Sequence, residues 1–303
     1  MLRTARSRLR LTLAALGTAA ALAAGFLTPA TATAAPGPGL RSARYVALGD
    51  SFTSGPSIPT QVNVTCGRSN ANYPSLLKEW LGITRFTDAS CGGAVTQDMW
   101  RPQPGRPGTT PQLDAIDSST ALVTLGIGGN DIGFGEIILR CAHAWPKPVP
   151  TDNPCQRYFT GSGTDELEQR IEQTAPKVAD ILRAIHQRAP HARIAVVGYP
   201  AVIGDDIAGC RTSLRIADGD IPYLRGVIRH LNAMLRRQAV AHDALYVNTN
   251  ATTADHDACR PFEDRYVEGL YVRPERPAIP VHPNADGERA MALAVVKTLI
   301  VGS

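Results

Sequence analysis

Five short apolar segments, separated by stretches with helical periodicity, constrain the fold of this chain more than any other feature. The segments span residues 44–48, 86–89, 121–127, 193–198 and 244–247, and the helical stretches span 72–81, 165–188, 221–242 and 284–300. Strands that alternate with helices indicate βαβ units and a mainly parallel sheet. Continuously apolar strands suit a sheet covered on both faces. We therefore predict a single α/β domain over residues 43–303, with a kink or break at Pro176 in the second helix.

The first 34 residues have the organisation of a secretory signal peptide. Four arginines within the first ten residues precede an apolar run over 11–27, and small residues end in Ala32-Thr33-Ala34. This order matches the charged, apolar and cleavage regions of such peptides. The alternative is a membrane anchor, for which a run of this length is at the lower limit. We predict secretion to the extracellular space, cleavage after Ala34, and a flexible leader over residues 35–42.

The net charge of +4 comes from the predicted signal peptide rather than from the body of the protein. Residues 1–34 hold four arginines and no acidic residue, so residues 35–303 carry 27 basic and 27 acidic side chains. A neutral body lacks the positive surface that phosphate contacts require. The sequence therefore argues against a nucleic-acid partner.

The six cysteines favour disulfides over a metal site. They contain no C-x-x-C pair, which makes zinc binding poorly supported, and an oxidising compartment predicts three disulfides. Six cysteines allow 15 connectivities. We favour sequential pairing, because each bond would then fix an irregular loop; the pairs are Cys66 with Cys91, Cys141 with Cys155, and Cys210 with Cys259.

Four motifs that can carry chemistry stand at the ends of predicted strands or before the last helix. Ser51 follows the first strand, Gly92 and Gly93 follow the second, Asn130 follows the third, and His282 precedes the final helix. A serine at a strand-to-helix turn can present its hydroxyl group above the sheet, and adjacent glycines let a backbone N–H approach a ligand closely. Ligands of open α/β sheets bind at the carboxyl ends of the strands. We expect these distant segments to converge.

With these four blocks in this order, the sequence resembles the SGNH (GDSL-type) hydrolase family, and in particular its secreted actinobacterial lipases and esterases. The resemblance runs from Tyr45 to Gly287. It implies a three-layer α/β/α sandwich with a five-stranded parallel sheet. It also implies Ser51 as nucleophile, His282 as general base, and an oxyanion hole formed by Ser51, Gly93 and Asn130, with a shift by one residue to Gly92 left open. No cofactor or metal is implied. The α/β-hydrolase alternative is disfavoured, because no Gly-x-Ser-x-Gly occurs.

One departure from the family pattern concerns the group that orients the histidine. Many members place an aspartate three residues before it, where this chain has Ile279. Our hypothesis is a Ser51–His282 dyad in which the backbone carbonyl of Ile279 or Pro280 accepts the Nδ1–H bond. The competing hypothesis is a carboxylate from elsewhere, with Asp255, Asp257 and Asp264 as the candidates.

Several other polar and aromatic residues receive a structural interpretation. Asp50 and Asp131 are expected to hold turns. The aromatic residues near strand ends are expected in the core more than in an acyl pocket; they are Trp100, Phe134, Trp145 and Tyr199.

The expected function is that of a monomeric, secreted serine esterase or lipase that acts on fatty-acyl or lipid esters. At most, it would contact lipid surfaces transiently. A phospholipase or a carbohydrate deacetylase would use the same chemistry. A non-catalytic secreted binding protein is the alternative from another class, and the presence of all four motifs disfavours it.

Overall fold

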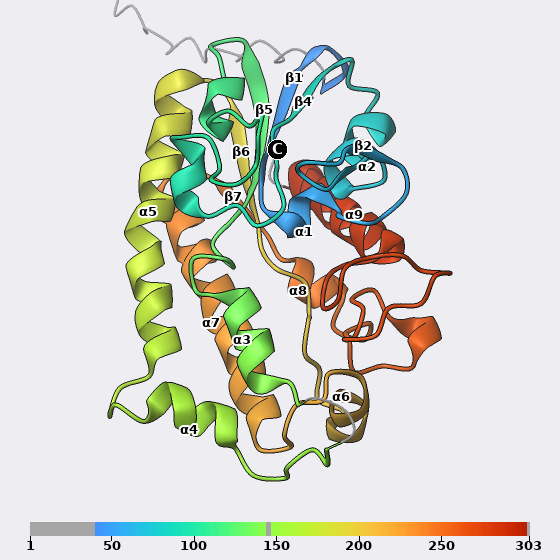
Figure 1. The fold of residues 1–303 in the computed structure, drawn as a ribbon. Coiled ribbons are helices and arrows are strands. Elements are labelled where there is room, and N and C mark those ends of the chain that lie inside the picture. Colours follow the sequence, from blue (N-terminus) through green and yellow to red (C-terminus); the bar gives the residue numbers. More distant parts are fainter. Residues whose placement is uncertain (1–39, 144–146, 302–303) are drawn as a thin grey trace, which may run out of the picture. The chain divides into compact units, whose positions relative to one another are not determined.

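Five parallel strands form the central sheet of the structure, a computed structural model that describes residues 40–143 and 147–301 (Figure 1). The strands are β1 (Arg44–Gly49), β4 (Arg85–Asp88), β5 (Thr120–Gly126), β6 (Arg193–Val197) and β7 (Leu245–Val247). Their order is β4-β1-β5-β6-β7, and all neighbours pair in parallel. The predicted signal peptide, residues 35–39 of the leader and Trp145 lie outside the described residues.

This strand order creates a place where a ligand can bind. The chain leaves β1 toward one edge of the sheet to form β4, then returns across β1 to form β5. Loops that follow β1 and β5 therefore run in opposite directions and separate at their carboxyl ends. The predicted α/β fold with a five-stranded parallel sheet is confirmed.

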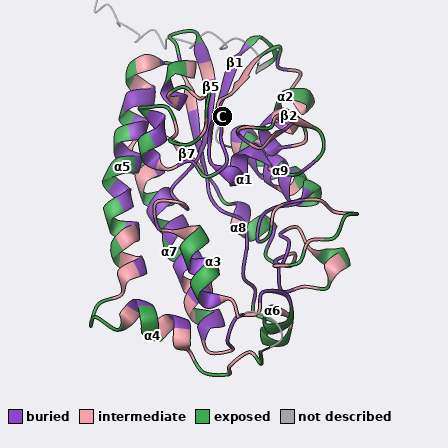
Figure 2. Ribbon diagram, in the orientation of Figure 1, coloured by how far each residue is buried: buried purple, intermediate pink, exposed green. Residues whose placement is uncertain are grey.

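Side chains that alternate across each strand build an apolar core on both faces of the sheet. In β1, Val46 and Leu48 belong to one buried cluster, whereas Tyr45 and Ala47 belong to the other, as the two-residue period of a strand requires. Helices α5 (Glu166–Arg188) and α7 (Asp220–Ala241) supply the first cluster, and α2 (Tyr73–Trp80) and α9 (Ala285–Val301) the second. The result is three layers, with the buried strands between them (Figure 2).

The expected break at Pro176 does not occur, because α5 runs as one helix from Glu166 to Arg188. Pro176 cannot donate to the carbonyl of Glu172, one turn earlier. Both residues are exposed, so water can satisfy that carbonyl. The buried stripe of the helix, which includes Val178 and Leu182, is left intact.

Short elements occupy the connections between the predicted strands and helices. Two helical turns are too few to show an apolar period, so the sequence did not predict α4 (Pro154–Thr160) or α6 (Ile207–Ser213). The remaining elements are η1 (Leu40–Ser42), α1 (Ser51–Ser54), β2 (Gln61–Asn63), β3 (Arg68–Ser69), η2 (Thr96–Met99), η3 (Gln112–Ala115), α3 (Phe134–Cys141), α8 (Thr249–Thr252) and η4 (Phe262–Asp264).

Three disulfides fix these connections in the favoured sequential pairing. The bonds join Cys66 to Cys91, Cys141 to Cys155, and Cys210 to Cys259. None of the described helices combines the length and the hydropathy needed to cross a membrane.

Candidate active site

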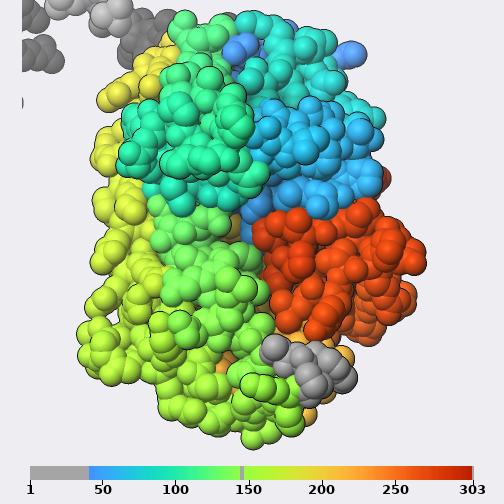
Figure 3. All heavy atoms as spheres, viewed as in Figure 1, coloured from blue at the N-terminus to red at the C-terminus, as the bar shows by residue number. Residues whose placement is uncertain are grey.

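The structure brings the four predicted motifs together at the carboxyl ends of the strands. Ser51, Gly93, Asn130 and His282 line one pocket of about 530 Å³. Strands β4, β1 and β5 are neighbours, so the turns that follow them are neighbours as well. His282 arrives from the segment before α9. In Figure 3 the chain near residue 60 (blue), residues 95–115 (teal), the start of α3 (green) and the segment before α9 (red) adjoin on one face.

A tight turn after β1 places the Ser51 hydroxyl in the pocket. The Asp50 side chain caps α1 by accepting the Phe52 N–H at 2.9 Å, which is the local structural role expected for it. Gly49 has no room for a side chain, since a Cβ atom there would lie 2.7 Å from the Gly126 carbonyl oxygen. The helix ends after four residues at Gly55, whose φ of 69° favours glycine. Ser51 is thus held on a short, fully buried helix.

Ser51 and His282 form a hydrogen-bonded pair with a defined proton arrangement. Ser51 Oγ lies 2.7 Å from His282 Nε2, and His282 Nδ1 lies 2.9 Å from the carbonyl oxygen of Pro280. A carbonyl oxygen can only accept, so Nδ1 carries the proton and Nε2 is free to accept from the serine hydroxyl. Burial lowers the pKa of His282 to about 4, and the Pro280 bond opposes this only in part. The imidazole is therefore neutral near pH 7.

Among the contacts of the described residues, none joins His282 to the carboxylate of Asp255, Asp257 or Asp264. Asp257 accepts the Cys259 N–H at 2.8 Å and pairs with Arg260 at 3.2 Å. Asp255 is almost fully exposed and lies 3.7 Å from the same arginine. The backbone carbonyl of Asp264 lies 2.7 Å from His256 Nδ1. The Nδ1–H bond of His282 goes to Pro280, while Ile279 forms part of the pocket wall.

Two aromatic rings that the sequence did not assign to the site enclose the imidazole. Phe52 stacks on His282 with ring centroids 4.5 Å apart, and Phe134 meets it edge-on at 5.8 Å. Phe134 is half-buried and packs against the core as expected, and it also lines the pocket. Trp100 is 43% exposed near Arg188, which contradicts a core position, whereas Tyr199 is buried as expected.

Three residues that line the pocket carry N–H groups suited to an oxyanion: Ser51, Gly93 and Asn130. The Gly92 N–H donates to the Cys66 carbonyl at 2.8 Å. Within the described part of the chain, the backbone N–H groups of Ser51 and Gly93 have no hydrogen-bond partner. Gly93 has a φ of 80°, which favours glycine. Asn130 donates one Nδ2 hydrogen to the Ala94 carbonyl at 2.9 Å and keeps the other. This geometry favours Gly93 over Gly92 as the donor.

Tyr199, at the end of β6, joins the turn after β1 to the turn after β5. Its hydroxyl group accepts the Gly129 N–H at 2.6 Å and donates to Asp50 Oδ2 at 2.5 Å. Burial raises the pKa of Asp50 to about 7 and that of Tyr199 well above 10, so the tyrosine keeps its proton. Asp131 fixes the same region by accepting the Thr96 N–H at 2.9 Å, in the structural role expected.

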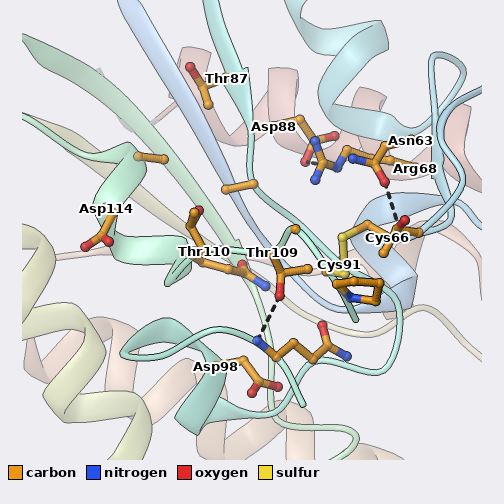
Figure 4. A pocket seen from close by; sticks show the side chains of 17 residues that line it. Asn63, Cys66, Arg68, Thr87, Asp88, Cys91, Asp98, Thr109, Thr110 and Asp114 are labelled. Atoms are coloured by element: carbon orange, nitrogen blue, oxygen red, sulfur yellow. Dashed lines mark hydrogen bonds and ion pairs between the residues drawn. A yellow bond between two sulfur atoms is a disulfide. The ribbon is translucent and has the colours of Figure 1, made fainter. Parts of the chain in front are cut away.

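A second hollow of about 560 Å³ adjoins the first at Cys66 and has a different character (Figure 4). Its walls are polar and include Arg68, Asp88 and Asp98. Three aspartates line it, of which Asp88 is bonded to Ser90 and Asp98 to the Val95 N–H. Among the described residues, no histidine lines this hollow. The Ser51 pocket is therefore the candidate active site.

A serine hydroxyl bonded to a neutral imidazole, placed at the carboxyl ends of a parallel sheet beside free N–H donors, is the arrangement of a serine hydrolase. The family follows from the sequence. A family model for GDSL-like lipases and acylhydrolases matches residues 47–290, and the chain belongs to this family. Its activity is that of a carboxylic-ester hydrolase.

Relatives and solved structures agree with this assignment. Lipase 2 of Streptomyces coelicolor is 42% identical over 285 residues, which cover 93% of this chain and 92% of the relative. An esterase of Streptomyces scabiei is 31% identical, over 87% of this chain and 84% of the relative. The extracellular lipase of Streptomyces rimosus superimposes with a TM-score of 0.68 at 25% identity, over 85% of this chain and all of that structure. Phospholipase A1 of Streptomyces albidoflavus gives 0.67 at 25% identity, over 85% and 99%.

Proposed function

We propose that this enzyme hydrolyses fatty-acyl or lipid esters through an acyl-enzyme on Ser51, with His282 as the general base. The observation that carries the proposal is the 2.7 Å contact between Ser51 Oγ and His282 Nε2, beside the free N–H groups of Ser51 and Gly93. A nucleophile within hydrogen-bond reach of an oriented base is the geometry that activates a serine.

The reaction proceeds in two steps, acylation of Ser51 and hydrolysis of the acyl-enzyme. His282 Nε2 takes the Ser51 proton as Oγ attacks the ester carbonyl, and the negative oxygen is held by Ser51 N–H, Gly93 N–H and the Asn130 amide. Collapse breaks the bond to the alcohol, which leaves with the proton from His282. Water then attacks the acyl-enzyme with the same base and releases the acid. Loss of one oxyanion donor typically reduces turnover by about 10²–10³.

The Pro280 carbonyl orients His282, as the aspartate of a catalytic triad does, but it carries no negative charge. It fixes Nδ1–H and hence the productive tautomer of His282. Being neutral, it stabilises the imidazolium less than a carboxylate does. The dyad proposed here therefore depends more strongly on the oxyanion hole.

Apolar walls favour an acyl chain over a sugar as the group that enters the pocket. Pro56, Val64, Phe134 and Ile279 contribute them. Val64 is 82% exposed, and Leu139 (85% exposed) lies one helical turn beyond the pocket residue Gly135. Exposed apolar side chains at a pocket rim suit transient contact with a lipid surface.

We also propose that the enzyme is exported and acts as a monomer that binds no nucleic acid. Three disulfides suit an oxidising compartment, and the S. rimosus relative is described as extracellular. All four proposed catalytic groups come from one chain, so the site is complete without a partner copy. With 27 basic and 27 acidic side chains, residues 35–303 have no net positive charge to attract a nucleic acid.

Replacement of the nucleophile tests the mechanism. Ser51→Ala is expected to lower turnover of p-nitrophenyl esters by at least about 10³-fold and to abolish labelling by a fluorophosphonate probe, without changing the fold. Ser54→Ala is the matched control, because it removes a buried hydroxyl group without a hydrogen-bond partner from the same short helix. Retained turnover or labelling in Ser51→Ala would disprove the assignment.

A further inference from the structure

The candidate active-site pocket contains one permanent charge, that of Arg106. Among the described residues that line the pocket there is no aspartate or glutamate, and His282 is neutral near pH 7. The remaining lining residues are apolar, hydroxyl, amide or glycine residues. The free N–H groups of Ser51 and Gly93 add partial positive charge to the same space. The pocket is therefore electropositive, although residues 35–303 as a whole are neutral.

Arg106 is held in place without having its charge neutralised. Its Nη1 donates to the Thr65 carbonyl at 2.6 Å, and its own carbonyl accepts the Thr109 hydroxyl at 2.9 Å. The side chain is half-buried, and in the described part of the chain no carboxylate lies within ion-pair distance of it. By contrast, Arg68 in the neighbouring hollow lies 3.9 Å from Asp88. Only one of the five guanidinium N–H groups of Arg106 is used, and the others remain free to donate.

A fixed guanidinium with free N–H groups is suited to an anion, and especially to phosphate. Its planar fork donates two parallel hydrogen bonds to phosphate oxygens, and a side chain already anchored loses little rotamer freedom on binding. The apolar walls of the pocket suit the acyl chain, which carries no charge. An anion that reaches Arg106 must then belong to the alcohol part of the ester.

We propose that Arg106 binds a phosphate group on the alcohol part of the substrate, so that the enzyme prefers acyl esters of a phosphorylated polyol over neutral esters with the same acyl chains. This proposal rests on the proposed function, since it assigns the substrate class of the same site. Arg106 acts in binding and takes no part in the proton transfers.

Two soluble substrates that differ only in the phosphate test this preference. Dihexanoylglycerol phosphate and dihexanoylglycerol carry identical acyl chains, and both are assayed below their aggregation concentrations. Arg106→Gln removes the charge but keeps an amide that can donate to the Thr65 carbonyl. We expect kcat/KM for the phosphate ester to fall about 10- to 100-fold, the usual range for a lost hydrogen bond to a charged group. Turnover of the neutral diester should change less than about threefold.

Arg101→Gln is the matched control, because Arg101 is an exposed arginine of the same loop that does not line the pocket. It should leave the ratio of the two kcat/KM values unchanged. Arg106→Lys, which keeps the charge, should recover part of the preference. Added salt should weaken wild-type turnover of the phosphate ester and spare the neutral one.

The outcomes separate this proposal from the catalytic one. An equal loss on both esters in Arg106→Gln would mean that Arg106 only braces the loop, and no loss on either would mean that it does not meet the substrate; each result overturns the proposal. A loss confined to p-nitrophenyl glutarate, relative to p-nitrophenyl valerate, would place the anion at the acyl end and overturn it as well. The catalytic proposal is tested separately by Ser51→Ala. Retained turnover of either ester in that variant would disprove the catalytic proposal, whatever the Arg106 variants show.

Discussion

His282 obtains its orientation from a neutral carbonyl oxygen, and this arrangement has consequences for pH dependence. The carbonyl of Pro280 selects the tautomer in which Nε2 accepts from Ser51. Burial among Phe52 and Phe134 disfavours the imidazolium ion, with no carboxylate to offset it. The base therefore remains unprotonated well below the pH at which an exposed histidine takes up a proton.

The pH profile of kcat/KM tests this arrangement, because it reports the pKa of the free enzyme. In the proposed mechanism the neutral imidazole accepts the Ser51 proton, so activity should fall as pH drops through about 4 rather than through the usual 6.5. Asp257→Asn should leave the pH of this acidic fall in kcat/KM unchanged, since Asp257 pairs with Arg260. A fall in kcat/KM centred near pH 6.5 would contradict the inferred environment of His282.

The lowered pKa also carries a consequence for stability. The unfolded chain binds a proton at this histidine more strongly than the folded protein does. The contribution of His282 is therefore fully present above about pH 6.5 and is lost as pH falls toward about 4.

At the scale of elements, the site depends on the distance between two turns that belong to neighbouring strands. The turn after β1 carries Ser51, and the turn after β5 carries Asn130. Tyr199, from the end of β6, bonds to Asp50 in one turn and to Gly129 in the other. We infer that this hydroxyl group fixes the spacing of nucleophile and oxyanion donor, which makes Tyr199 a positioning residue.

Tyr199→Phe tests that role, because it removes the hydroxyl group and keeps the ring that meets Phe52 edge-on at 5.1 Å. It leaves the Gly129 N–H and Asp50 Oδ2 without this partner, a change worth about 1–3 kcal/mol. We expect kcat to fall about 10-fold with little change in KM. Tyr246→Phe, on β7, makes the same chemical change away from both turns and should keep kcat. Equal effects of the two variants on kcat would argue against the positioning role.

At the scale of the whole molecule, the three disulfides divide into one beside the site and two away from it. Cys66 lines the pocket, its carbonyl accepts the Gly92 N–H, and its bond partner Cys91 lies next to Gly92. The bond between Cys210 and Cys259 closes a longer stretch of chain, with a sequence separation of 49 against 25. Their removal should therefore affect different properties.

Paired serine substitutions separate the two effects. Cys66→Ser with Cys91→Ser should lower kcat even where the protein is fully folded, because the Gly92–Gly93 turn loses its anchor. Cys210→Ser with Cys259→Ser should lower the free energy of unfolding by about 2–5 kcal/mol with kcat nearly unchanged. Activity assays at 25 °C and urea unfolding of both variants provide the comparison. The idea fails if both pairs change kcat equally.

The sheet, its long helices and the segments of the site could be predicted from the sequence alone, because these features leave local signals. Short, continuously apolar segments, helical spacing over 165–188 and 221–242, and glycine-bounded turns after three strands are visible without a structure. The order of Ser51, Gly93, Asn130 and His282 predicted which segments converge.

How these groups are held and what surrounds them could not be predicted from the sequence. The partner of His282 Nδ1, the bond that occupies the Gly92 N–H, and the bridge formed by Tyr199 depend on hydrogen bonds whose directions no residue pattern encodes. Tyr199 and Asp50 are 149 positions apart, and Arg106 reaches the pocket from a loop without periodicity. Contacts between distant segments follow from packing of the whole chain, since the local sequence specifies elements and not the distances between them.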